Sequence, residues 1–140
     1  MILHVNYEEI RALRSGGRSL LDGESELPSF VLAPPESRAR VEALLPLLDG
    51  DISVGTLAEL RAVAMAVEAI VEQLRVEMES AVLATHAADE LAVAAYFDFA
   101  HGLTVARRLQ EMASEMEALI EVVTGHPVDP EAVASFRFPD

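Results

Sequence analysis

The chain has 140 residues and a mass of 15.1 kDa, a size typical of one domain. Hydrophobic residues make up 51% of it, which predicts a packed core rather than intrinsic disorder. Its 24 acidic residues face ten basic ones, all arginine, for a net charge of −14. A negative surface repels phosphate backbones and anionic lipids. We therefore expect no direct nucleic-acid binding and no membrane attachment, whereas a basic protein partner is compatible with this charge.

The absence of cysteine excludes disulfides, thiolate zinc sites, iron–sulfur clusters and cysteine nucleophiles. The first residues lack the basic and long apolar regions of a signal peptide. The longest uninterrupted apolar run, Leu91 to Phe97, is far shorter than a membrane span. These features predict a cytoplasmic protein.

Residues 1–34 are expected to form an N-terminal arm with one short helix. Asn6 and Glu9 have the spacing of a capping box, which predicts a helix from Tyr7 to Arg14. The pair Gly16-Gly17 is expected to end that helix. A strand over Ile2–Val5 would need an edge from another chain, because the sequence offers no evident partner strand.

A second short helix is predicted within residues 35–49. Pro35 suits the first turn of a helix, and Pro46 is expected to distort the last one. The sequence Asp49-Gly50-Asp51 then breaks the chain. Thr56, with Glu59 three residues later, is expected to cap the next helix.

Residues 56–124 carry one unbroken heptad pattern of apolar and small side chains. Two structures satisfy it: one helix about 100 Å long at 1.5 Å per residue, or an antiparallel hairpin that turns near residues 85–89. We favour the hairpin, because a helix of this length is unusual in so small a domain. The fold class is thus all-α, a long hairpin packed with short N-terminal helices. Residues 125–140 form a tail whose Phe136 and Phe138 are expected to dock on the bundle or on a neighbouring subunit.

The apolar stripe of the hairpin is wider than two helices can cover. We therefore predict a helical bundle formed by dimerisation, since twofold dimers are the commonest oligomers. The residues expected at that interface are Leu57, Leu60, Val67, Val71, Leu74, Met78, Phe99, Leu109, Met116 and Ile120.

Motifs for chemistry are scarce. No glutamate has a His or Glu three residues later, so the pattern of di-metal carboxylate bundles is absent. The nearest match is Asp98-x-x-His101, which a hairpin would place opposite Arg75 and Glu72. The favoured interpretation is two interhelical ion pairs, and the alternative is a catalytic or metal site. Arg107-Arg108 is expected to pair locally with Glu111.

These observations favour a non-enzymatic protein–protein interaction module that acts as a helical homo-oligomer, as an adaptor, chaperone-like or assembly component, with no metal or cofactor. One alternative is a small helical enzyme or metal-binding bundle that uses Glu72, Arg75, Asp98 and His101. Another is an acidic inhibitor that mimics nucleic acid. Its candidate acids are Glu68, Glu72, Glu79, Glu111, Glu115 and Glu121.

Overall fold

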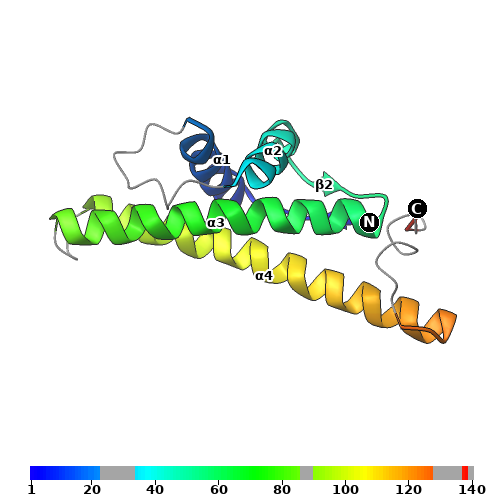
Figure 1. The fold of residues 1–140 in the computed structure, drawn as a ribbon. Helices are drawn as coiled ribbons and strands as arrows, with labels where there is room; N and C mark the ends of the chain where they lie inside the picture. Colours follow the sequence, from blue (N-terminus) through cyan, green and yellow to red (C-terminus); the bar gives the residue numbers. More distant parts are fainter. Residues whose placement is uncertain (23–33, 86–89, 128–136, 139–140) are drawn as a thin grey trace.

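Four α-helices dominate the computed structural model, which describes residues 1–22, 34–85, 90–127 and 137–138. They are α1 (Tyr7–Asp22), α2 (Pro35–Leu44), α3 (Leu57–Thr85) and α4 (Glu90–Thr124). The long helices α3 and α4 lie antiparallel and side by side, and α1 and α2 pack against α3 (Figure 1). The predicted hairpin is confirmed and the single continuous helix is excluded. The residues between the two long helices, 86–89, lie outside the described ones.

A two-stranded antiparallel sheet joins the start of the chain to the segment before α3. Strand β1 (Ile2–Leu3) pairs with β2 (Ile52–Ser53), with Leu3 opposite Ile52. The amide of Val54 extends the pairing by donating to the carbonyl of Met1 at 2.9 Å. The edge that a strand here needs comes from the same chain, about 50 residues later, and not from another chain. Two strands of two residues each are too short to show alternation in a sequence.

Both predicted capping boxes are present. The amide of Asn6 donates to Glu9 Oε1 at 3.0 Å, and the amide of Glu9 donates to Asn6 Oδ1 at 2.8 Å. At the start of α3, the amide of Glu59 donates to Thr56 Oγ1 at 3.0 Å. The carboxylate of Glu59 accepts from the amide of Gly55 at 2.6 Å. Each pair satisfies amides that a helix start leaves without intrahelical partners.

The helix α2 begins and ends where its prolines predict. Pro35 occupies the first turn of α2, and Pro46 lies in the 3₁₀ turn η2 (Leu45–Leu47) that follows. The guanidinium of Arg38 donates to the carbonyls of Leu20 and Leu21, at 3.2 and 2.7 Å. It thereby satisfies carbonyls in the last turn of α1 and ties α2 to that end.

The glycines of α1 do not end the helix as predicted. The helix continues through Gly16 and Gly17 to Asp22, and both glycines are buried. A Cβ atom on Gly16 would lie 2.7 Å from Leu74 Cγ, and one on Gly17 would lie 2.7 Å from Leu45 Cδ2. Glycine in a helix costs about 1 kcal/mol relative to alanine. Here it lets α1 approach its neighbours more closely than any other residue would allow.

The core lies where α1, α2 and α4 meet α3. Leu74 of α3 touches glycine from two helices, because a Cβ atom on Gly102 of α4 would lie 3.0 Å from Leu74 Cδ1. The largest side chains with almost no exposed surface are Leu3, Leu13, Leu48, Ile52, Leu57, Leu60, Ile70, Leu74, Leu109, Val41, Val67 and Val105. They come from every helix and from both strands, so the N-terminal arm is part of the core.

Most residues that we assigned to a dimer interface belong to this single-chain core. Leu57, Leu60, Val67, Val71, Leu74, Leu109 and Ile120 are buried, and Met78, Phe99 and Met116 are partly buried. The helices α1 and α2 of the same chain pack on the hairpin and cover part of its wide apolar stripe. The seven buried residues are therefore not accessible to a second copy in this fold.

The end of the chain docks on the start of α3. Phe138 is buried, and its amide donates to the carbonyl of Gly55 at 2.8 Å, beside a bridge between Thr56 and Arg137. Docking of the tail is confirmed for Phe138, whereas Phe136 lies outside the described residues. Within the described ranges, no helix has both the length and the apolar character that crossing a membrane requires.

The glycine contacts predict that alanine in place of Gly16 lowers the free energy of unfolding, whereas alanine usually stabilises a helix relative to glycine. Gly16→Ala should lower the free energy of unfolding by about 1–3 kcal/mol, because the methyl group must displace Leu74 and Ile70. Gly50→Ala is the matched control, since nothing lies within 4 Å of a Cβ atom there. Urea unfolding of both variants provides the measurement. A Gly16→Ala variant as stable as the parent chain would contradict the close approach of α1 to α3.

Candidate functional site

The four residues predicted to form a cluster are divided between two sites. On α3, Arg75 donates to Glu72 Oε2 at 3.1 Å and to Glu79 Oε1 at 2.6 Å. These bonds lower the pKa of Glu72, chiefly through the hydrogen bond from Arg75. No ion pair joins Arg75 to Asp98 among the described residues, so the predicted interhelical pairing was wrong. Arg75 instead binds Glu72 and Glu79, which lie three and four residues away on the same face of α3.

Asp98 and His101 of α4 face α1 instead. Arg11 of α1 lies 3.6 Å from Asp98 Oδ1 and also binds Glu8, at 3.0 Å. His101 lines a groove of about 490 Å³ between the two helices, whose other lining residues are Glu8, Arg11, Glu90, Val93, Ala94 and Phe97. The sequence analysis missed Arg11, because nothing local shows that α1 packs on α4. Within the described ranges, no three His, Cys, Asp or Glu side chains are placed to hold a metal ion.

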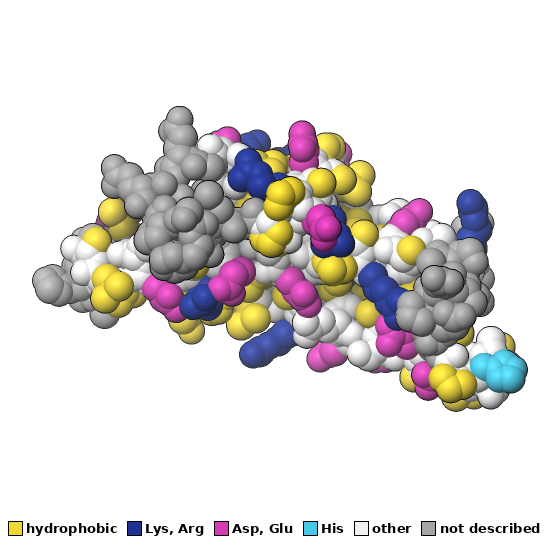
Figure 2. Space-filling model, viewed as in Figure 1, with side chains coloured by type: hydrophobic (Ala, Val, Ile, Leu, Met, Phe, Trp, Pro, Cys, Tyr) yellow, Lys and Arg dark blue, Asp and Glu magenta, His cyan; other side chains and the backbone are white. Residues whose placement is uncertain are grey.

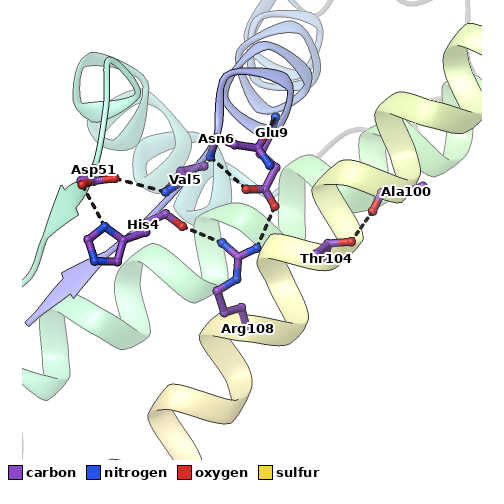
Figure 3. A network of polar contacts seen from close by, with 8 residues as sticks. All are labelled: His4, Val5, Asn6, Glu9, Asp51, Ala100, Thr104 and Arg108. Atoms are coloured by element: carbon purple, nitrogen blue, oxygen red, sulfur yellow. Dashed lines mark hydrogen bonds and ion pairs between the residues drawn. The ribbon is translucent and has the colours of Figure 1, made fainter.

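Among the residues that the structure describes, the most buried charge belongs to Glu9, which forms an ion pair with Arg108 of α4 (Figure 3). Its side chain is only 3% exposed, and Glu9 Oε2 accepts from Arg108 Nη2 at 2.9 Å. The other terminal nitrogen of Arg108 donates to the carbonyl of His4 at 2.6 Å. The predicted pairing of Arg108 with Glu111 was wrong, because Arg108 extends away from its own helix toward α1 and the first strand.

A second polar contact holds the same end of the chain. His4 Nδ1 lies 2.9 Å from Asp51 Oδ2, and the amide of Val5 donates to Asp51 Oδ1 at 3.4 Å (Figure 3). The bond with His4 is the main cause of a lowered pKa at Asp51. The polar groups drawn together here are directed at one another, so this network anchors the N-terminal segment.

Some acidic side chains of the hairpin have partners beside them. On the face drawn in Figure 2, arginine side chains lie among the acidic ones. Arg75 binds Glu72 and Glu79, while Glu68 accepts from Gln110 at 2.6 Å. These contacts are typical of solvated helix faces.

One exposed surface is apolar instead. We call it the α4 outer face and define it by Val93, Tyr96, Phe97, Ala100 and Thr104. Val93 is 43% exposed, Tyr96 56% and Phe97 54%, and the two aromatic rings pack edge to face with centroids 6.0 Å apart. The hydroxyl of Thr104 already donates to the carbonyl of Ala100 at 2.9 Å (Figure 3). This face is opposite the side of α4 that packs on α3.

The α4 outer face also lacks charge. From residue 91 to residue 106 the sequence contains one acidic residue, Asp98, and no arginine. That carboxylate is directed toward Arg11 of α1. In a chain with a net charge of −14, an uncharged helix surface with two exposed aromatic rings is the candidate functional site.

Comparison of the chain with protein-family models, with curated proteins and with solved structures found no match.

The division of the predicted cluster can be tested through the pKa of Glu72. Arg75→Gln should raise that pKa toward the ordinary value of 4.5, because the charged donor is lost. A lowered pKa contributes stability above pH about 4.5, and that stability is lost as the pH falls through the folded value. His101→Gln should leave the pKa unchanged. NMR titration measures both, and an equal response to the two variants would restore the predicted cluster.

The Glu9–Arg108 pair predicts a large cost for removing one partner. Arg108→Met should lower the free energy of unfolding by about 3 kcal/mol, because it leaves the buried carboxylate of Glu9 without a counter-charge. Adding Glu9→Gln should recover most of this loss, since glutamine is neutral and still suits the capping box. Arg18→Met, at an exposed site on α1, is the control and should change stability by less than about 0.5 kcal/mol. Equal losses from Arg108→Met and Arg18→Met would contradict the buried pair.

Proposed function

We propose that the protein is a non-enzymatic protein–protein interaction module that acts as a homo-oligomer through the α4 outer face. The exposure of this uncharged apolar surface is the observation that carries the proposal. In this proposal, α4 presents its outer face to a partner. Packing of α4 on α3 holds that face in place, and α1 and α2 complete the core.

The composition of the face supports an interface. Burying apolar surface contributes roughly 25 cal/mol per Å², and aromatic side chains dominate the binding energy of many interfaces. Tyr96 and Phe97 supply two such rings, and Val93 and Ala100 continue the apolar surface along the helix. The half-buried Ala100 is small enough to admit a large side chain from a partner.

Charge supports a second copy as the partner. Two chains of net charge −14 repel each other, but the Debye length of about 8 Å at physiological salt limits this repulsion to nearby groups. A contact centred on the α4 outer face keeps the acidic surfaces of α3 away from its centre. Closed twofold dimers are also the commonest assembly of identical chains.

The polar side chains support a non-enzymatic role. The acids of the predicted cluster bind arginines of α1 and α3, Glu72 with Arg75 and Asp98 with Arg11. These are surface ion pairs of the kind that contribute little beyond local order.

A matched pair of substitutions on one helix tests the proposal. The parent chain should scatter light as a particle of about twice 15.1 kDa. Val93→Glu places a charge in the α4 outer face and should weaken self-association at least about tenfold. Val122→Glu, at an 81% exposed valine in the last turns of α4, should not. A parent chain that remains monomeric at high micromolar concentration would overturn the proposed function.

A further inference from the structure

We infer that the α4 outer face binds the same face of a second copy in antiparallel orientation, with Glu90 of each chain paired with Arg107 of the other. The inference rests on the proposed function and adds the geometry of the contact. It follows from the order of side chains along α4.

The apolar face belongs to a regular seam with a charge at each end. The seam consists of Glu90, Val93, Phe97, Ala100, Thr104 and Arg107. The intervals between them are three, four, three, four and three residues, which is the spacing that keeps side chains on one side of a helix in a coiled coil. The acid begins the seam and the base ends it, so the seam is complementary to its own reverse.

An antiparallel partner uses this complementarity fully. If the twofold axis crosses α4 midway between Phe97 and Ala100, each Phe97 lies opposite the small Ala100 of the other chain. Val93 then lies opposite Thr104, and Glu90 lies opposite Arg107. Twofold symmetry repeats every contact, so the contact contains two ion pairs and two large-to-small packing pairs.

A parallel partner would make the opposite contacts. Each Glu90 would face Glu90, each Arg107 would face Arg107, and the two Phe97 rings would compete for the same layer. Like charges in contact are unfavourable, so they disfavour the parallel orientation. This effect discriminates between the two orientations more strongly than the apolar contacts at the centre do. The charge order therefore selects the antiparallel arrangement.

Both charged residues are available for these contacts. Glu90 and Arg107 are exposed, and neither forms an ion pair within the part of the chain that the structure describes. The opposite side of α4 carries the buried residues Gly102, Val105, Ala106 and Leu109. The helix α1 borders the seam, since Glu8 and Arg11 share an open groove with Glu90, Val93 and Phe97, and these three seam side chains remain exposed beside it.

Charge reversal tests the pairing. Glu90→Arg and Arg107→Glu should each weaken dimerisation about tenfold, because each substitution places two pairs of like charges in the contact. The double variant carrying both substitutions restores opposite charges and should return to within about threefold of the parent dissociation constant. Sedimentation equilibrium measures the constants, and circular dichroism checks that helix content is unchanged. Single variants that dimerise like the parent, or a double variant that stays weak, would overturn the pairing.

A distance measurement tests the orientation independently. The chain has no cysteine, so Ser114→Cys provides a single site for a spin label on exposed α4 surface. In the antiparallel dimer the two labels lie about 46 Å apart along the helices, at 1.5 Å per residue over about 31 residues. In a parallel pair they would lie within about 20 Å of each other. A dimer with the short distance would overturn this inference but leave the proposed function standing, whereas a monomeric parent chain would overturn both.

Discussion

The contact of Leu74 with two glycines is the constraint on which the arrangement of the helices depends. Leu74 is almost fully buried, and a Cβ atom would lie 2.7 Å from it at Gly16 of α1, which is a clash, and 3.0 Å from it at Gly102 of α4, which is a tight contact. Because Gly16 and Gly102 have no Cβ atom, the backbones of α1 and α4 can lie close to α3 around the side chain of Leu74. The unfavourable effect of glycine on helix formation is offset by this packing, because tertiary contacts contribute more to helix stability than intrinsic propensity does.

Docking of α1 on the hairpin also determines which polar groups meet. With α1 beside the first half of α4, Arg11 comes within reach of Asp98, and the buried carboxylate of Glu9 comes within reach of Arg108. Arg108 then also holds the carbonyl of His4 and so fixes the entry to the first helix. The described part of the N-terminal arm thus becomes a structural element of the bundle and covers part of the apolar stripe of α3 and α4, whereas Leu91, Leu119 and Val123 remain exposed.

The same packing leaves apolar side chains of α4 exposed beside the groove that α4 forms with α1. On the hairpin, Glu72 meets Arg75 and Glu68 meets Gln110. The α4 outer face instead combines exposed Tyr96 and Phe97 with a nearly uncharged stretch of sequence. An apolar surface that the fold supports from behind, and that opposite charges border at its two ends, is the basis for the self-association that we propose.

Elements with local causes could be predicted from the sequence: the helix starts at Asn6 and Thr56, the distortion at Pro46, and the helical character of both long segments. The heptad pattern alone fitted one long helix as well as a hairpin, so the antiparallel packing of α3 and α4 became evident only in the structure. The same is true of the position of α1. Gly16-Gly17 has the pattern of a helix end, and it becomes a helix interior because Leu74 and Leu45 occupy the space that side chains would take. The pairing of β1 with β2, and the partners of Asp98 and Arg108, likewise join residues far apart in the chain. Short-range spacing carries no information about such contacts, because they form only when packed helices bring distant segments together.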